Sequence, residues 1–488
     1  MIALVITIIV LLILAAVSIA TLTGENGILT QAGNAKINTE QSSAEEQVKI
    51  AVLGSYDIDG KLDYKALKDN LNQINGIEGV PDTITDESFP LLVKVNGYKV
   101  MIDSDGTAKL PIAGTKYETQ TTITVQGTQV VVPAKFTVSG LAEESTVDNG
   151  LVIYLIPDGE TVDWDNAEEV ENAKKTYDQF VWVPVPNAIA EDMNGDNTVD
   201  TTDIDLMIAA KKYPMAIATD STNYRGILYD FTLTNGEVVV SDQAWSATST
   251  SYREPAYLED KNYADKSTYN NVGITPDTLQ EEFNTMVEKV ANNKGFWVGR
   301  YETSNMNGGS STTDNSYDDI QQIDVVKEAT TGVSGVNWYR MYAQQKNYAK
   351  LEFGESTTTT SSMIWGSQWD QIMIWMKDVD NTVQNSKYIV NSIGMGNFGS
   401  ISGVEDGWSS TSSPAPTGYQ EIYKVKNVYD LAGNVYDWTL EACFADNRVD
   451  RGGYYSDTSS SNTRADYRYC YSSPISSFTY YGSRSSLY

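Results

Sequence analysis

The first 22 residues, Met1–Leu22, contain no charged side chain. The core of a bilayer offers no water to hydrogen-bond the backbone. A single segment can therefore pair all its N–H and C=O groups there only by forming a helix. A helix of this length spans about 33 Å, close to the thickness of the hydrocarbon core of a bilayer. A secretory signal peptide would begin with basic residues and have a shorter apolar run. The segment therefore predicts a membrane-spanning helix.

The composition of the 488-residue chain excludes several classes of function. Its net charge of −31 argues against nucleic acid as a partner, because nucleic-acid-binding domains carry basic patches. The absence of histidine removes the Ser-His-Asp triad and histidine-based zinc sites. The two cysteines, Cys443 and Cys470, are too few for a zinc cluster. In an oxidising compartment they are candidates for one disulfide.

The order of local signals predicts a multidomain α+β chain. Residues 56–110 combine helical spacing at 62–74 with a hairpin around Asn96-Gly97, which indicates a small α/β head. Residues 111–178 hold short strands separated by Gly, Asp and Asn turns, which predicts a β-rich connector. Further on, Thr275-Pro276 marks the start of a helix, with the capping residue followed by proline. The stripe expected to be buried on this helix is Leu279, Phe283, Met286, Val287 and Val290.

Residues 192–203 have the ligand spacing of a calcium-binding EF-hand loop. Oxygen-bearing side chains occupy positions 1, 3, 5, 9 and 12, and Asn197 at position 6 tolerates a left-handed turn. The run resembles one dockerin repeat, with its exit helix expected within an insertion at 192–212. Dockerins carry two such repeats, and only one is visible here. We therefore expect a calcium ion that stabilises the loop rather than binding to a cohesin partner. The alternative is an acidic loop that is solvated and binds no metal. The expected calcium ligands are Asp192, Asn194, Asp196, Asp200 and Asp203, with the carbonyl of Thr198.

The apolar run continues into an amphipathic segment. Gly24-Glu25-Asn26-Gly27 follows the run, and the amphipathic pattern extends through Glu45–Leu53. Residues 1–55 thereby resemble the N-terminal helix of type IV pilins and pseudopilins, especially the bacterial form ending in Thr-Gly-Glu-Asn-Gly. The resemblance implies a helix that holds the subunit in the membrane and then packs with other pilin subunits in a filament. The family's leader does not precede Met1, and Val5 stands where the family has an acid. We therefore expect a processed form or a misassigned start, with a plain membrane anchor as the alternative.

The C-terminal segment from Gly453 onward has the composition of a binding surface. It contains eight Tyr and eleven Ser but no Lys or Glu, and three Arg minus two Asp give it a net charge of +1. Tyr supplies large, rigid contact area and Ser supplies adaptable hydrogen bonding. The alternative is a disordered low-complexity terminus. The anchors that flank the segment, Arg451-Gly452-Gly453 and Gly482-Ser483-Arg484, favour an ordered surface.

Several short runs between Gln179 and Tyr488 carry a family resemblance. They are Phe180–Pro184, Gly299–Thr303, Val336–Tyr339, Met363–Trp369, Tyr429–Thr439, Arg448–Gly453 and Tyr481–Arg484. In this order they are similar to the formylglycine-generating sulfatase-modifying domains, whose signatures include Gly-Asn-Val-Trp-Glu-Trp, Arg-Val-x-Arg-Gly-Gly and a closing Gly-Phe-Arg. The resemblance implies a C-type-lectin-like fold for residues 179–488. The tryptophans expected in its core are Trp338, Trp365, Trp369 and Trp438.

The oxidation chemistry of that family is not expected here. Those domains oxidise a substrate cysteine with oxygen, using copper and two cysteines that follow the Arg-Gly-Gly strand. The matching positions fall near Asp457 and Asn462, so we expect neither an enzyme nor a copper site. A nucleotide is not expected either, because Gly394–Gly399 fits G-x-G-x-x-G but a loop follows it where a helix is needed.

Some lectin-fold members of this family are the variable proteins of diversity-generating retroelements. In them the segment between the two anchors is mutagenised at adenine codons, which yields Asn, Tyr, Ser and Asp, and Tyr454–Tyr481 has that composition. We therefore predict a pilin-like adhesin at the bacterial cell surface, with a non-catalytic, hypervariable domain that binds an extracellular protein or glycan. Tyr467, Tyr469 and Tyr471 are expected to share one face. The candidate contact residues are Tyr454, Tyr455, Asp457, Asn462, Asp466, Tyr467, Tyr469, Tyr471, Tyr480 and Tyr481.

Two other functions fit the same sequence. The first is a structural pilus subunit with a non-variable domain that binds protein or carbohydrate. The second is a membrane-tethered oxidase of the formylglycine-generating type, which would need thiolates that the matching positions lack. A near-copy of the final gene segment beside a reverse transcriptase gene would favour the variable adhesin over both.

Overall fold

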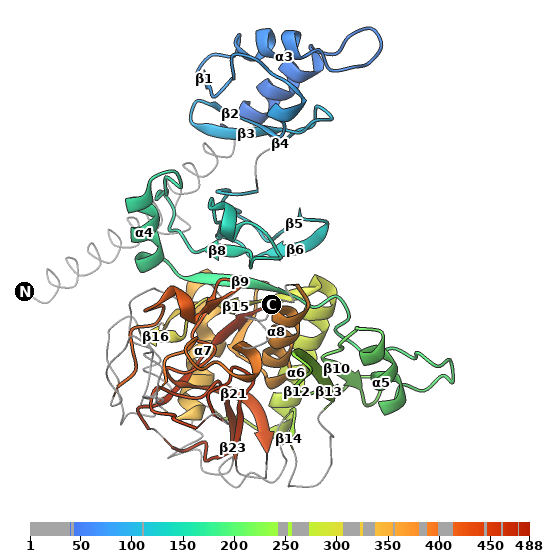
Figure 1. The fold of residues 1–488 in the computed structure, drawn as a ribbon, viewed down its shortest axis with the longest axis vertical. Coiled ribbons are helices and arrows are strands. Elements are labelled where there is room, and N and C mark those ends of the chain that lie inside the picture. The colour runs from blue at the N-terminus through green and yellow to red at the C-terminus, as the bar shows by residue number, and fades with distance from the viewer. Residues whose placement is uncertain are drawn as a thin grey trace, which may run out of the picture. The chain divides into compact units, whose positions relative to one another are not determined.

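The computed structural model describes residues 40, 43–109, 112–242, 252–255, 273–305, 323–325, 337–354, 357–379, 388–398, 413–443, 447–459, 462–476 and 478–488. The protein is mixed α+β with several sheets, as expected (Figure 1). Its contacts define a smaller unit, Met1–Thr115 with Ile156–Thr161, and a larger unit, Lys116–Leu155 with Val162–Tyr488. The predicted membrane-spanning helix Met1–Leu22 lies outside the described residues, and none of the helices within them is long and apolar enough to cross a membrane.

The smaller unit packs two helices against a four-stranded antiparallel sheet. The sheet has the order β1 (Ile77–Glu78), β2 (Leu91–Val95), β3 (Tyr98–Ile102) and β4 (Ala108–Lys109). Asn96 and Gly97 join β2 to β3 with φ values of 51° and 89°, which confirms the predicted hairpin. The helices cover residues 43–53 and α3 (Tyr64–Leu71), whose first N–H groups are capped by Asp63. The core includes Val48, Leu67, Leu71, Val93 and Val100.

The larger unit contains a six-stranded antiparallel sheet. Its order is β18 (Ser361–Met363), β25 (Ser485–Leu487), β15 (Gly295–Gly299), β9 (Gln179–Pro184), β8 (Val152–Tyr154) and β7 (Thr137–Val138). The C-terminal strand β25 therefore lies inside this sheet, between two strands that come much earlier in the chain. Strands β7 and β8 arise from the segment expected to be a connector, so the sheet runs across the expected boundary at residue 178.

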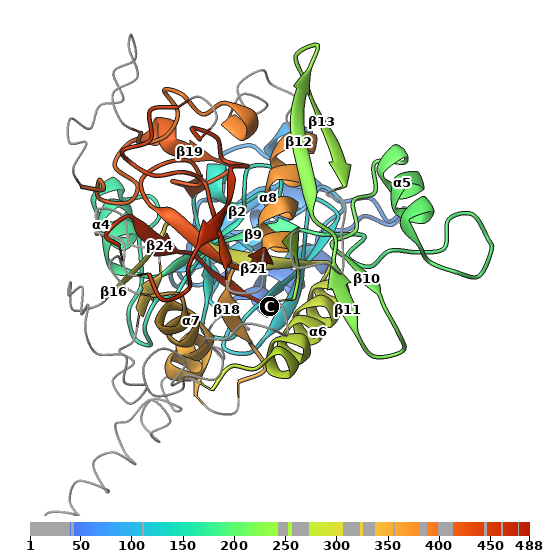
Figure 2. The same ribbon diagram turned by 90° about the horizontal axis from the view of Figure 1, so that it is seen from below.

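A second sheet of the larger unit has five strands. The order is β14 (Tyr252–Arg253), β21 (Tyr436–Cys443), β22 (Arg448–Arg451) and β23 (Arg468–Ser472), and β24 (Tyr481–Ser483) pairs parallel with β21. Only Arg484 separates β24 from β25, so the chain passes from one sheet to the other at this residue. Seen from below, β21 and β24 lie close together (Figure 2).

Among the described residues of the larger unit are several complete α-helices. They are α4 (Ala167–Thr176), α5 (Thr201–Ala209), α6 (Pro276–Asn293), α7 (Trp338–Phe353) and α8 (Gly366–Val379). The α6 helix confirms its prediction, because Thr275 caps it, Pro276 occupies its first turn and the five expected residues are buried. The α8 helix contacts both β9 and β21 and thus lies where the two sheets meet. Trp338, Trp365, Trp369 and Trp438 are fully buried, as expected of core residues.

Two-stranded hairpins complete the larger unit. They are β5 (Thr121–Val125) with β6 (Thr128–Val132), β10 (Ala216–Ala218) with β11 (Tyr224–Gly226), β12 (Tyr229–Thr234) with β13 (Glu237–Asp242), β16 (Thr303–Asn305) with β17 (Ile323–Val325), and β19 (Lys424–Val425) with β20 (Val428–Tyr429). In both ribbon views α5 and the loop before it project from the side of this unit (Figures 1 and 2).

Candidate ligand-binding face

A left-handed turn positions the start of β21. Gly433 and Asn434 have φ values of 82° and 62°. A Cβ atom on Gly433 would lie 2.2 Å from the carbonyl oxygen of Asn397, so only glycine fits there. The Asn434 side chain donates to Glu302 Oε2 (2.5 Å), and its Oδ1 accepts from Asn397 Nδ2 (2.9 Å) and from the N–H of Ala415 (2.8 Å). Gly433 and Asn434 thus fix the conformation of the backbone immediately before Tyr436.

Two glycines turn the chain away from the end of β22. Gly452 and Gly453 have φ values of 84° and 78°. A Cβ atom would lie 2.6 Å from the Leu431 carbonyl oxygen at Gly452, and 2.5 Å from the Asn462 carbonyl oxygen at Gly453. Both positions therefore require glycine for conformation and for space. The Arg-Gly-Gly run is the anchor at which the loop carrying most candidate contact residues begins.

Arg484 forms the second anchor of the segment. Its side chain is fully buried between the two sheets. The guanidinium donates to the carbonyl oxygens of Gly299 and Tyr429, both at 2.9 Å, and its Nε lies 3.3 Å from Asp437 Oδ2. These bonds tie β24 to β15 and β21. Because both ends of the 454–481 segment are held by buried contacts, its exposed side chains can change without altering the anchors.

The two faces of the five-stranded sheet carry different chemistry. Successive side chains on a strand alternate between faces, and cross-strand partners share one. One face, which we call the ionic face, pairs Asp437 with Arg451 and Arg451 with Arg468 in register. Arg451 bridges Asp370 and Glu441, with 3.4 Å between its Nη1 and Glu441 Oε2. Arg468 reaches the same two carboxylates at 2.8 Å and 3.0 Å, so the charges on this face are mutually compensated.

The opposite face collects aromatic rings. In register, Trp438 faces Asp450, Asp450 faces Tyr469, and Tyr436 faces Tyr481. The ring centroid of Tyr436 lies 4.9–6.3 Å from those of five other tyrosines. We call this surface the aromatic face. It comprises Tyr436, Trp438, Tyr454, Tyr467, Tyr469, Phe478, Tyr480 and Tyr481, with Asp450 and Asp457 beside the rings.

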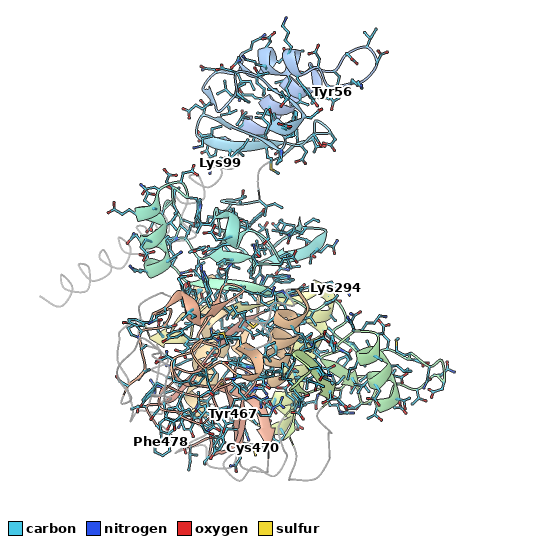
Figure 3. All side chains as sticks on the ribbon, viewed as in Figure 1. Tyr56, Lys99, Lys294, Tyr467, Cys470 and Phe478 are labelled. Carbon is cyan, nitrogen blue, oxygen red and sulfur yellow. The ribbon has the colours of Figure 1, made fainter. Side chains whose placement is uncertain are left out.

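The aromatic face has an inner and an outer layer. Trp438, Tyr436 and Tyr481 are buried, and Tyr481 Oη lies 2.9 Å from Ser472 Oγ. Phe478 and Tyr469 are exposed by 52% and 37%, and Tyr454, Tyr467 and Tyr480 are half-buried. Tyr467, Cys470 and Phe478 lie together at the end of the larger unit farthest from β9 (Figure 3). The outer rings are therefore available to a ligand, whereas the inner rings support them.

Two buried carboxyl groups lie beside these rings. Asp450 is fully buried and accepts from Ser472 Oγ, and its Oδ1 has no hydrogen-bond partner among the described residues. Asp457 accepts from Tyr436 Oη (3.1 Å), Asn462 Nδ2 (3.2 Å) and the N–H of Tyr454 (3.1 Å). Burial raises the pKa of both carboxyl groups above the ordinary range, and that of Asp450 well above it. Within the described part of the chain, neither group forms an ion pair.

Most of the predicted contact residues come together on this face. Tyr467 and Tyr469 share it as predicted, with ring centroids 6.3 Å apart, whereas the side chain of Tyr471 lies outside the described structure. Tyr455 is buried and packs edge-on against Tyr454. Asn462 donates from its amide to Asp457 Oδ1, which brings these two candidate residues together.

Asp466 lies away from the aromatic face. Its Oδ1 accepts from Arg464 Nε at 2.7 Å. The positive charges of Arg451 and Arg468, on the ionic face, also favour its ionised form. The candidate set also omitted residues that the structure brings together there, namely Tyr436, Trp438, Asp450 and Phe478. Strand alternation applied to Tyr436–Cys443 and Arg448–Arg451 would have placed Tyr436, Trp438 and Asp450 on one side. Phe478 follows β23 in a loop, where no periodic signal exists.

Cys443 and Cys470, the candidates for a disulfide, lie close together in the structure. Both cysteines are free, buried thiols, and Cys443 Sγ donates to the carbonyl oxygen of Cys470. The two residues lie on β21 and β23, and with Val449 of β22 they form one buried cluster. Burial raises the pKa of the Cys443 thiol, so the thiol stays protonated.

The predicted calcium loop has a compact, internally bonded backbone. Asp192 accepts from the N–H groups of Gly195 (2.7 Å) and Asn197 (2.9 Å), and Asn197 is left-handed with φ 66°, as expected for position 6. Asp203 accepts from the N–H groups of Met193 (2.8 Å) and Asp200 (2.9 Å), at the start of α5. In the part of the chain that the structure describes, no group of three or more acidic, cysteine or histidine side chains is arranged to hold a metal ion. The loop keeps oxygen donors of the type that calcium prefers.

Comparison with known proteins yields a weak structural similarity and no sequence match. Neither a family model nor a curated protein matches the sequence. Among solved structures, the chain is similar to Treponema denticola variable protein 1, with 14% sequence identity and a TM-score of 0.24. The match covers 39% of this chain and 95% of that protein.

Proposed function

We propose that this protein is a bacterial cell-surface adhesin whose aromatic face binds an extracellular protein or glycan. The larger unit would have a C-type-lectin-like fold and no catalytic role, and residues 1–55 would act as a pilin-type anchor and filament helix. The observation that carries the proposal is the aromatic face itself, in which buried rings support an exposed layer. Tyrosine is enriched at binding hot spots, because it combines a large apolar body with a polar tip.

The anchors on both sides of the segment support a variable surface. Gly452 and Gly453 hold one end and Arg484 holds the other, through contacts made by backbone atoms or buried charges. Substitution of the exposed rings between them leaves those contacts in place. We therefore propose that Tyr454–Tyr481 tolerates diversification, as in the variable proteins of diversity-generating retroelements.

The proposal is tested by removing one exposed ring from the displayed protein. Cells that display the full chain are probed with arrays of extracellular proteins and glycans, and surface display is followed with an antibody. Tyr469→Ala should weaken any array signal by about 30-fold, the effect of losing one hot-spot side chain. Display should be unchanged, because Tyr469 is 37% exposed.

The matched control is Tyr419→Ala, which removes a tyrosine that is 44% exposed and outside the aromatic face. It should leave both binding and display unchanged. Equal binding by the Tyr469 and wild-type proteins, or no ligand on either array, would show that the aromatic face is structural.

We also propose that residues 192–203 bind one calcium ion, which would stabilise the projecting loop. Its carboxylates repel one another unless a divalent cation is present. Calorimetric titration of the full chain should show a single calcium site that Asp192→Ala abolishes. Asp205→Ala, which removes an exposed carboxylate from the adjoining helix, should leave the site intact. An undiminished heat of binding in the Asp192 variant would contradict the assignment.

A further inference from the structure

We propose that the aromatic face recognises an arginine side chain of a protein ligand. The inference rests on the proposed function and specifies the ligand chemistry of the same surface. Its basis is the coincidence of exposed aromatic rings with buried carboxyl groups that, among the residues described, form no ion pair. A planar cation supplied by the ligand would both stack on the rings and compensate the carboxyl groups.

The first argument is charge. Asp450 sits in the centre of the sheet with an unpartnered Oδ1, and Asp457 lies near it. The Asp457 carboxylate makes ionisation of Asp450 less favourable, and burial raises the pKa of both groups. A cation bound over the neighbouring rings would reverse both effects. The chain as a whole carries a net charge of −31, which also attracts basic ligands.

The second argument is that the nearest internal cation is already committed. Arg451 follows Asp450 in sequence, but strand alternation directs its side chain to the ionic face. There it bridges Asp370 and Glu441, which are both fully buried. Arg468 is bound to the same pair. Moving either guanidinium to the aromatic face would leave Asp370 and Glu441 with a single cationic partner.

The third argument is the orientation of the rings. The planes of Tyr436 and Tyr469 are 14° apart, those of Tyr467 and Tyr469 are 24° apart, and Phe478 and Tyr480 are 12° apart. Nearly parallel rings suit a flat guanidinium better than a compact ammonium group. The protein uses the same chemistry internally, because the Arg448 guanidinium lies 4.6 Å from the ring centre of Trp338.

The test compares two ligands that differ only in charge. The full chain is titrated with the peptide acetyl-Gly-Ser-Arg-Ser-Gly-amide and with the same peptide carrying citrulline, a neutral isostere of arginine. Nuclear magnetic resonance of the peptide reports binding. The arginine peptide should bind about tenfold more tightly, the combined effect of a cation–π contact and nearby carboxylates.

Asp450→Asn is the decisive variant, since it keeps the shape of the side chain and the bond to Ser472. It should bring the affinity for the arginine peptide close to that for the citrulline peptide. Asp457→Asn should act in the same direction, and it replaces Asp450→Asn if that variant fails to fold. Asp205→Asn removes an equal charge from an exposed helical position and should have no effect.

Equal affinities for the two peptides, or no binding of either, would overturn the inference. A preference for arginine that survives both aspartate substitutions would overturn it as well. These outcomes are separate from the proposed function, because array binding that depends on Tyr469 would still establish a ligand-binding face of different specificity.

Discussion

Replacing Arg451 with methionine is expected to lower the free energy of unfolding of the larger unit by about 3–5 kcal/mol, the usual effect of breaking a buried ion pair. Arg451, Asp370 and Glu441 are all fully buried. The substitution keeps much of the side-chain volume but leaves Asp370 and Glu441 with Arg468 as their remaining partner. Arg468 carries one positive charge, so one buried negative charge would be uncompensated.

The measurement is chemical denaturation followed by tryptophan fluorescence. All ten tryptophans belong to the larger unit, so the signal reports on that unit alone. Lys175→Met is the matched control, because it breaks a 2.8 Å ion pair with Glu171 whose side chains are 47% and 52% exposed. That change should be below about 0.5 kcal/mol. Similar losses in the two variants would mean that the buried network contributes no more than a solvated pair.

Gly452→Ala is expected to destabilise the larger unit by more than about 3 kcal/mol, from left-handed strain and a steric clash together. The clash involves the Leu431 carbonyl oxygen, which would lie only 2.6 Å from the new Cβ atom and belongs to the backbone of a tightly bonded turn. Relief would require the loop after β22 to move. The same movement would displace Tyr454 and thereby weaken binding at the aromatic face.

Gly236→Ala separates the two causes. Gly236 has φ 87°, close to the 84° of Gly452, but a Cβ atom there would meet nothing within 4 Å. It should therefore show only the conformational penalty, about 1–2 kcal/mol. Denaturation curves of both variants give the comparison. Equal losses would indicate that the approach of Leu431 to Gly452 relaxes without cost.

Local structure was predictable wherever a short run carries its own physical signal. Asn96-Gly97 specifies a two-residue hairpin because both residues accept positive φ. Thr275-Pro276 specifies a helix start because the threonine caps and the proline needs no N–H acceptor, and the apolar spacing after it identifies the buried stripe. These signals depend on neighbours in sequence, so no knowledge of the tertiary fold is needed.

Long-range pairing was not predictable in the same way. The position of β25 between β18 and β15 joins residues 485–487 to strands at 361–363 and 295–299, and nothing in three residues of Ser-Ser-Leu selects those neighbours. The contact between Cys443 and Cys470 shows the same limit, because it joins β21 to β23 and neither strand selects the other through its local sequence.

The candidate site was predictable in composition but not in electrostatics. The density of tyrosine between Gly453 and Gly482 identified most of the rings, since exposed tyrosine is unusual in a solvated loop. Asp450 and Asp466 look alike in sequence, each close to arginine residues. Only the sheet register separates them, by directing Asp450 toward the rings, while Asp466 is bound by Arg464.

The central place of β25 has a consequence for biosynthesis. The six-stranded sheet cannot close until residues 485–487 have left the ribosome, because β15 and β18 pair with that strand from opposite sides. Folding of the larger unit therefore follows synthesis of the whole tyrosine-rich segment. Any insertion or deletion that shifts the reading frame within that segment also replaces β25, so a frameshifted chain cannot complete the sheet.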